Sequence, residues 1–373
     1  MLTQAPSPTT VRAGLLSLED AHGVVLAGVH PRRSSRFDSL RPRPLLPVAG
    51  VPLVTYAIRW LAEGGLSRIL CCTNGPARGV QDVAPFACDE DITLGFLEDW
   101  MPRGSAGCVR DAAARTSARS LVVVEGSVVP TVALAEVLAT HREAGAGLTL
   151  VTHAGAGTTG AVAGGICVVE RAALENVPVT GFHDIKEMLI PLLTRLGARV
   201  ATHHAPGAPA RVVDVATYLA LNAWVLAGWA RKGASSGAAP LIADPTAHVG
   251  NGVRVIGPVL LGPEVTVESG AILVGPTVVS AGSKIERGAV VSRSVLWQGC
   301  LIGAGAEVDL SVVADGVSTR PGARVYGALL TDRPATPLPA AVARPSRTES
   351  PHRRRAAPGW RATPGSPIAP APR

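Results

Sequence analysis

The residues best suited to chemistry follow the first apolar run of the chain. Residues 23–28 are predicted to form a short buried strand that ends in a turn, and the basic stretch after it contains Arg33 and Arg43. A second candidate is the turn at residues 104–107, where a helix is predicted to start. Glycines there permit close backbone approach, and a helix N-terminus favours anions. Both segments suit a ligand that carries negative charge.

Alternating strands and helices are predicted to position these segments. Short apolar runs bounded by turn residues predict strands, and apolar residues at helical spacing predict helices. The predicted strands are 23–28, 67–72, 91–96, 121–125, 147–152 and 165–169, and the predicted helices are 53–63, 105–115, 132–144 and 217–226. This alternation predicts a mostly parallel α/β sheet, in which ligands bind beyond the carboxyl ends of the strands.

A six-residue repeat begins at Val249. An aliphatic residue stands at every sixth position without a break, at Val249, Val255, Leu261, Val267, Leu273, Val279, Ile285 and Val291. Four positions after each of them stands a small or β-branched residue, which lets the chain turn tightly. The register slips near Trp297 and once more after Val308. The pattern predicts a parallel β-helix, whose short strands each point an apolar residue inward.

Most of the net charge of +7 belongs to the C-terminal segment. From residue 331 onward, eight arginines stand against two acidic residues, which leaves about +1 for the rest of the chain. Ten prolines in the same segment predict a disordered basic tail. A nucleic-acid-binding fold is therefore not expected.

Cysteine spacing and hydropathy exclude further classes. The six cysteines form no CxxC pair, so no zinc site is suggested. No apolar stretch approaches the roughly 20 residues of a membrane span, and the first residues lack the pattern of a signal peptide. We therefore expect a protein of the reduced cytoplasm that has no membrane span.

The segment from Ala27 to Gly50 resembles the signature loop of the sugar-1-phosphate nucleotidyltransferases, also called NDP-sugar pyrophosphorylases. Residues 44–52, Pro-Leu-Leu-Pro-Val-Ala-Gly-Val-Pro, match it closely, and the spacing from Ala27 to Pro44 equals the family's. The chain is most similar to the type with a C-terminal left-handed β-helix, such as mannose-1-phosphate guanylyltransferases. The resemblance covers residues 23 to about 330. It implies a Rossmann-like nucleotide-diphospho-sugar transferase domain followed by a left-handed parallel β-helix.

The resemblance also implies a reaction. In that family a sugar phosphate oxygen attacks the α-phosphorus of a nucleoside triphosphate, and pyrophosphate leaves. Loop N–H groups, basic side chains and a Mg²⁺ ion on two aspartates hold the phosphates. Carried over to this chain, Ala27 and Gly28 lie in the nucleotide-binding loop, and Arg33 and Arg43 stand at catalytic basic positions.

The phosphate loop departs from the family pattern. Val29 and Pro31 stand at two glycine positions, and proline offers no N–H group to a phosphate. Arg43 replaces a lysine, and a guanidinium differs from an ammonium in size and hydration. The loop therefore keeps its charge but not its geometry.

The metal site departs further. Ser127 stands where the first Mg²⁺ aspartate is expected, and a neutral hydroxyl is a poor substitute for a carboxylate ligand. Glu125, two residues earlier and on the same side of the strand, is a candidate replacement. Asp214 matches the second metal aspartate, with helix capping as the alternative interpretation.

Two glycine-containing segments retain the pattern. Gly104, Ser105 and Gly107 resemble the turn that receives the nucleotide base, with ordinary helix packing as the alternative. Gly164 and Gly165 resemble the strand beside the sugar. Both segments remain candidates for ligand contacts.

Three functions follow from these observations. The favoured one is a catalytically impaired relative that binds a nucleotide or nucleotide sugar, regulates an active homologue, or both. The alternative is an active pyrophosphorylase with a divergent site that uses Mg²⁺. A hexapeptide-type acyltransferase is disfavoured, because the coil contains only His248, at its start.

The expected organisation has five parts. These are an irregular N-terminus (1–19), the nucleotidyltransferase-like α/β domain (20–232), a linker (233–243), the β-helix (244–330) and the basic tail (331–373). The expected ligand is a nucleoside triphosphate or nucleotide sugar. Because stacked repeats need capping or partners, we also expect a homo-oligomer, or a hetero-oligomer with an active homologue.

Overall fold

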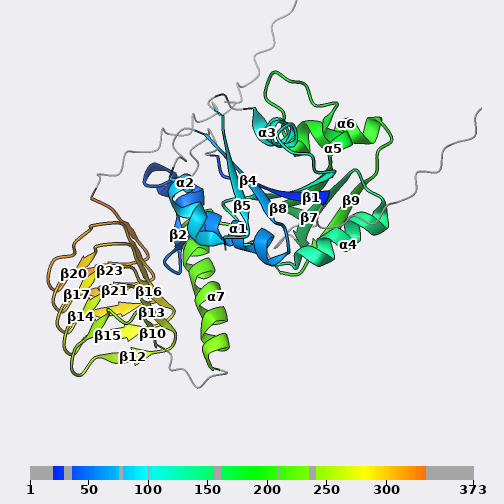
Figure 1. Ribbon diagram of the computed structural model, residues 1–373. Coiled ribbons are helices and arrows are strands. Elements are labelled where there is room, and N and C mark those ends of the chain that lie inside the picture. The colour runs from blue at the N-terminus through cyan, green and yellow to red at the C-terminus, as the bar shows by residue number, and fades with distance from the viewer. Residues whose placement is uncertain are drawn as a thin grey trace, which may run out of the picture. The chain divides into compact units, whose positions relative to one another are not determined.

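The computed structural model describes residues 20–28, 36–74, 79–88, 90–99, 101, 103–154, 161–207, 210–234 and 241–332 (Figure 1). The predicted irregular N-terminus and nearly all of the predicted basic tail lie outside the described residues. So do Val29, Pro31 and Arg33 of the phosphate loop.

A seven-stranded sheet has the order β5-β4-β1-β6-β8-β7-β9. Its strands are β1 (Ala21–Leu26), β4 (Arg68–Thr73), β5 (Thr93–Glu98), β6 (Ser120–Glu125), β7 (Leu148–Ala154), β8 (Ala161–Glu170) and β9 (Val200–Ala205). β8 runs antiparallel to both of its neighbours, and the other pairs are parallel. The predicted mostly parallel α/β sheet is therefore confirmed.

Helices cover both faces of this sheet (Figure 1). One face carries α1 (Leu53–Glu63), α2 (Val80–Val83) and α4 (Leu134–Ala144), and the other carries α3 (Gly104–Ala113), α5 (Arg171–Leu174) and α6 (Ile190–Arg195). Successive side chains of a strand point to opposite faces. Accordingly, Val25 and Cys71 belong to one buried core, and Val24 and Cys72 to the other.

The six-residue ladder folds into stacked coils with three parallel sheets. The first sheet contains β10 (Leu241–Ala243), β13 (Val259–Leu261), β16 (Thr277–Val279), β19 (Val295–Leu296), β22 (Val312–Val313) and β24 (Leu329–Leu330). The second contains β11 (His248–Val249), β14 (Thr266–Val267), β17 (Lys284–Ile285) and β20 (Leu301–Ile302). The third contains β12 (Arg254–Ile256), β15 (Ile272–Val274), β18 (Val290–Ser292), β21 (Glu307–Asp309) and β23 (Arg324–Tyr326). This arrangement is that of a parallel β-helix.

The register slip arises at one corner of the coil. Val267 pairs with Ile285, 18 residues later, whereas Val279 pairs with Leu296, 17 residues later. Gly275 and Pro276 form the two-residue corner of one coil. In the next coil a single residue, Arg293, makes the same turn with φ of 46°. The slip predicted near Trp297 therefore lies at Arg293, where the left-handed conformation saves one residue.

Buried hydroxyl groups satisfy the backbone at this corner. Ser294 Oγ donates to Ser292 O at 2.6 Å and accepts from Ser311 N at 3.0 Å. Ser311 repeats the pattern in the next coil, where its Oγ donates to Asp309 O at 2.7 Å and accepts from Ala328 N at 3.1 Å. The small residues of the repeat therefore carry hydrogen bonds as well as permitting a tight turn.

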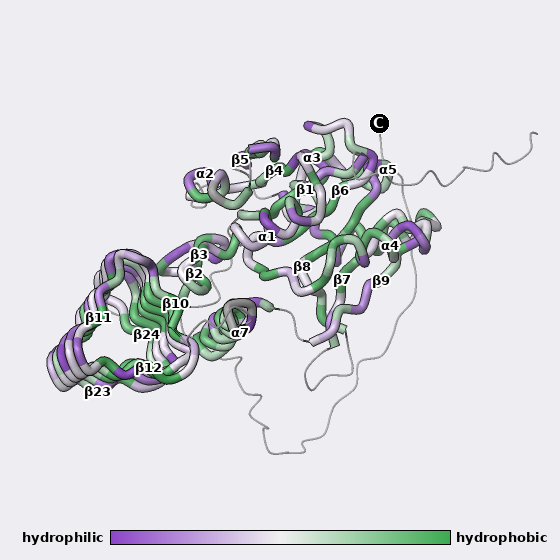
Figure 2. Tube along the Cα trace, turned by 60° about the horizontal axis from the view of Figure 1, so that its bottom comes forward, coloured by the Kyte–Doolittle hydropathy of each residue, from purple (hydrophilic) through white to green (hydrophobic). Residues whose placement is uncertain are grey.

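A third core joins the β-helix interior to other parts of the chain. The short strands β2 (Pro47–Val48) and β3 (Val51–Pro52) precede α1, and α7 (Val215–Ala234) precedes the β-helix. Residues of β2 and α7 pack with the coil residues in this core. Figure 2 shows hydrophobic residues along the β-helix side that carries β10 and β24.

The boundaries differ in detail from the sequence expectations. β10 (Leu241–Ala243), in the stretch expected to be a linker, pairs with β13. The division into a 20–232 domain and a 244–330 domain stays a prediction. Of the helices in the described part of the chain, none combines the length and hydropathy needed to cross a bilayer.

Candidate functional site

The carboxyl ends of β1 and β6 meet at the predicted ligand edge. Leu26 lies in register with Glu125, and Gly126 N donates to Leu26 O at 2.9 Å. A Cβ atom on Gly126 would lie 3.3 Å from the Cβ of Ala27. The structure therefore brings Ala27 next to the segment that contains Glu125.

Gly28 follows directly and lies beside Asn74, which comes just after β4. A Cβ atom on Gly28 would lie 3.2 Å from the Asn74 amide. The next residues of the phosphate loop are outside the described part of the chain, so Arg33 and its role as a catalytic residue stay a prediction.

Glu125 pairs with Arg211 rather than standing alone. Arg211 Nη2 lies 2.9 Å from Glu125 Oε2. Gly165, with φ of 78°, adjoins both, because a Cβ atom there would lie 2.9 Å from Arg211 Nη2 and 3.1 Å from Glu125 Cδ. Gly164 faces away from this pair, toward the His153 ring, at 2.9 Å from its Nε2 by the same measure. The structure therefore places Gly165, but not Gly164, at the Glu125 end of β6.

Asp214 forms the N-terminal cap of α7. Its Oδ1 accepts hydrogen bonds from the Thr217 backbone N and from Thr217 Oγ1, each at 2.8 Å. These bonds hold the pKa of the Asp214 carboxyl below its usual range. Within the described ranges, no cluster of three or more His, Cys, Asp or Glu side chains could hold a metal ion. The capping interpretation accounts for these contacts, and the metal role of Asp214 stays a prediction.

Arg43 is held by a carboxylate in its own segment. It lies in the 3₁₀ turn Arg43–Leu45, and its Nε and Nη2 donate to Asp38 Oδ1 and Oδ2 at 2.7 and 3.0 Å. A bidentate pair of this kind fixes the guanidinium plane and occupies two of its three nitrogen atoms. Arg43 is therefore less available to a phosphate than an unpaired lysine would be.

The turn at the start of α3 is engaged by the chain itself. Ala106 N and Gly107 N both donate to His183 O, at 2.9 and 3.3 Å. Ser105 Oγ donates to Asp184 Oδ2 at 2.9 Å. Gly104 has φ of 74°, and a Cβ there would lie 2.4 Å from His183 O. These contacts are those of helix packing, and the role of the turn in nucleotide binding stays a prediction.

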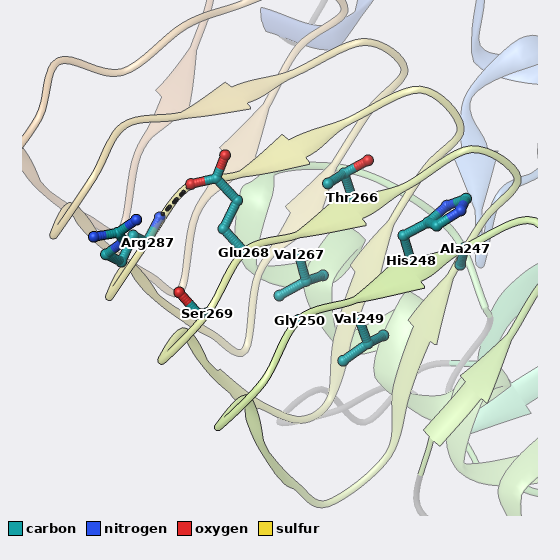
Figure 3. Close-up of a pocket in the computed structure, with 9 residues that line it drawn as sticks. All are labelled: Ala247, His248, Val249, Gly250, Thr266, Val267, Glu268, Ser269 and Arg287. Carbon is teal, nitrogen blue, oxygen red and sulfur yellow. Dashed lines mark hydrogen bonds between the residues drawn. The ribbon is translucent and has the colours of Figure 1, made fainter.

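An open groove on the β-helix contains His248 (Figure 3). Glu268 and Arg287 line the same groove, and Glu268 Oε2 accepts from Arg287 N at 3.1 Å. Glu268 also pairs with Lys284 at 2.8 Å. None of the described residues forms a hydrogen bond with the His248 ring, and the acyltransferase interpretation stays disfavoured on the sequence alone.

Sequence reasoning missed the partners of the predicted site residues. An isolated bridge with Val128 brings Arg211 close to the end of β6. No periodicity in the sequence predicts this bridge. Asp38 precedes Arg43 by five residues, a spacing that does not by itself predict an ion pair. His183 and Asp184 are distant in sequence from the turn that they cap.

Comparisons with known proteins find one distant likeness. No protein-family model matches the chain. The chain is 23% identical over 135 residues to a mannose-1-phosphate guanylyltransferase of Mycobacterium tuberculosis. The match covers 36% of this chain and 38% of that protein, well under two thirds of its length. This weak likeness supports a relationship to sugar nucleotidyltransferases at the family level.

Proposed function

We propose that the chain binds a nucleotide or nucleotide sugar at the carboxyl ends of β1 and β6, beside Gly165 of the antiparallel strand β8, with little or no pyrophosphorylase turnover. The observation that carries this proposal is the convergence of Ala27, Glu125, Gly165 and Arg211 at that edge. Parallel α/β sheets bind their ligands at such an edge. The distant likeness to a mannose-1-phosphate guanylyltransferase favours a nucleotide or sugar phosphate as the ligand.

The impairment of catalysis is argued from charge and geometry. Phosphoryl chemistry of this type needs several positive groups and a metal around the transferred phosphate. Ser127 is neutral, Glu125 is paired with Arg211, and Arg43 is paired with Asp38. The remaining groups suit binding by charge better than in-line attack.

The alternative is an active enzyme with a divergent site. In that case Mg²⁺ would be held by Asp214 with Glu125 in place of the aspartate missing at Ser127. Glu125 distinguishes the two hypotheses, because it binds a metal only if the protein is an active enzyme. The Glu125→Gln variant would then lose activity.

A panel of assays tests the proposal. Purified protein is given each nucleoside triphosphate with mannose-, glucose- or N-acetylglucosamine-1-phosphate and Mg²⁺ or Mn²⁺, and pyrophosphate release is measured. We expect no release above background, together with calorimetric binding of at least one nucleotide or nucleotide sugar. Release at about one per second or faster would favour the active alternative.

Partners and architecture complete the proposal. The sheet domain is proposed to be Rossmann-like and the coil left-handed. We also propose a cytoplasmic homo-oligomer, or a hetero-oligomer in which this chain regulates an active homologue. Light scattering and pull-down with such a homologue test the assembly.

A further inference from the structure

The guanidinium of Arg211 forms an ion pair with Glu125 at the carboxyl end of β6. Arg211 Nη2 lies 2.9 Å from Glu125 Oε2, and the two side chains keep 29% and 34% of their surface exposed. Nη2 is itself buried, yet its N–H bonds reach no acceptor in good geometry among the described residues. Arginine carries five N–H donors, and at least those on Nη2 are given to no hydrogen-bond acceptor among the described residues. The pair therefore has unused donor capacity on a partly exposed group.

The backbone fixes this arginine in place. Arg211 bridges Val128 in antiparallel fashion, and Val129 N donates to Ala210 O at 3.2 Å. The next residue, Val212, is buried. Gly165 supplies the space, because a Cβ atom there would come within 2.9 Å of Nη2 and the backbone has φ of 78°. The segments that contain Val128 and Gly165 therefore hold Arg211 in place, in addition to its ion pair.

The carboxylates implied for a metal are already engaged. A divalent cation on Glu125 would lie against the Arg211 guanidinium, and like charges at such short range repel strongly. Asp214 Oδ1 accepts two hydrogen bonds from Thr217. At this edge, the described residues therefore favour the positive charge of the Arg211 side chain over a bound Mg²⁺ ion.

We propose that Arg211, oriented by Glu125, binds the phosphates of the ligand in place of a divalent cation. This inference rests on the proposed function and names how its site holds the diphosphate group. A guanidinium matches phosphate oxygens in bidentate geometry and stays charged at any physiological pH. Binding of a nucleoside diphosphate sugar therefore needs no divalent metal. Arg211 is a binding residue, and Glu125 is the residue that positions it.

Calorimetry on the full chain tests this inference. Four probes, GDP-mannose, UDP-glucose, ADP-glucose and dTDP-glucose, are titrated once in excess EDTA and once in MgCl₂. For a probe that binds, we expect Kd values that agree within about twofold in the two buffers. Loss of charge-assisted hydrogen bonds in Arg211→Ala should weaken binding about 10- to 100-fold. Arg211→Lys should fall between, because it keeps the charge without the planar fork.

Matched controls separate a binding effect from a folding effect. Arg195→Ala removes an exposed arginine at the end of α6 and should leave Kd unchanged. Circular dichroism and melting temperature are recorded for every variant, and the double variant Glu125→Gln/Arg211→Gln keeps the pair neutral if Arg211→Ala does not fold. That double variant should bind as weakly as Arg211→Ala.

Each outcome has a defined meaning. Binding that appears only with Mg²⁺ overturns the inference and leaves the proposed function intact. Binding in EDTA that survives Arg211→Ala, or the double variant in its place, also overturns it. Absence of binding to every probe in both buffers contradicts the proposed function itself, and the inference with it.

Discussion

Trp297 Nε1 donates a 2.9 Å hydrogen bond to Tyr218 Oη, and the two rings lie edge to face with centroids 6.4 Å apart. The Tyr218 hydroxyl in turn donates to Pro47 O. Phe37 packs against Tyr218 with a centroid distance of 4.9 Å. One buried aromatic cluster therefore joins the β-helix turn after β19, the helix α7 and the segment after the phosphate loop.

Arg41 ties the surface of this cluster together. Its guanidinium carbon lies 5.3 Å from the centre of the Trp297 ring, and its Nη2 lies 2.6 Å from Asp315 Oδ2. The pair is partly exposed, so it contributes less to stability than the buried rings do. These two contacts connect the segment just before Arg43 to the coil.

Tyr218→Phe should lower the free energy of unfolding. Without the hydroxyl, the Trp297 N–H and the Pro47 carbonyl lose a buried partner, which costs about 2–3 kcal/mol. Urea unfolding followed by Trp fluorescence measures the change. Trp224→Phe, on the same helix but 51% exposed, is the matched control and should stay within about 0.5 kcal/mol. A Tyr218→Phe effect as small as the control's would show that the hydrogen bonds contribute nothing measurable.

Ser294→Ala should destabilise the β-helix corner. The substitution leaves Ser292 O and Ser311 N without their buried hydroxyl partner, at a cost of about 1–3 kcal/mol. In the preceding coil, Thr277 supplies the equivalent hydroxyl. Ser294→Thr keeps a hydroxyl at its own position, so it should recover most of the loss. Exposed Ser269→Ala is the control. Equal stability of Ser294→Ala and wild type in guanidinium melts would show that the Ser294 hydroxyl does not stabilise this corner.

Glu170→Gln should cost stability at neutral pH and progressively less in acid. Burial raises the pKa of Glu170, but hydrogen bonds from His141, Ser120 and Arg119 outweigh burial and leave the pKa lowered. A depressed folded pKa stabilises the protein above the unfolded value of about 4.3, and this contribution is lost as the pH falls through the folded pKa.

Urea unfolding at a series of pH values measures this effect. We expect a difference of about 1–2 kcal/mol between Glu170→Gln and wild type at neutral pH. The difference should shrink as the pH falls below about 4. Glu175→Gln, an exposed neighbour, should follow wild type throughout. A difference that stays constant down to strongly acidic pH would rule out titration of Glu170 as its source.

Thiol reactivity should separate the six cysteines into two groups. None of them forms a disulfide, and Cys88 and Cys108 are the two that are not fully buried. Burial raises the pKa of Cys71, Cys167 and Cys300 to about 12, so these thiols form little thiolate near neutral pH. We expect Ellman's reagent to titrate at most two thiols in the native protein and six in denaturant. The Cys88→Ser/Cys108→Ser variant should show no fast phase, and a persisting one would contradict this assignment.

Local signals predicted most elements well. Apolar residues at helical spacing followed by Gly64 give α1 as Leu53–Glu63, the predicted range. The six-residue ladder predicted the coil, because an inward aliphatic residue is required once per short strand. β9 and α6 were not predicted, because α6 has only six residues with a proline in its first turn, and β9 contains the polar pair His203 and His204.

Long-range partners could not be predicted in the same way. The meeting of Glu125 with Arg211 depends on an isolated bridge, and the capping of α3 depends on His183, 79 residues from Gly104. No residue type or spacing within either segment specifies its partner. The family resemblance located the candidate residues, but their pairing follows only from the folded chain.

The one-residue corner at Arg293 has a consequence for how such a chain changes length. Each corner residue bonds to the coil before it: Arg293 N donates to Val274 O, Leu310 N to Ser292 O, and Gly327 N to Asp309 O. The two coils after Arg293 have the same one-residue corner, with φ values of 48° at Leu310 and 60° at Gly327. The strands on both sides of the corner stay paired where the two-residue corner of one coil meets the one-residue corner of the next. A length change of one residue at this corner is therefore absorbed locally, and the coils beyond it remain aligned.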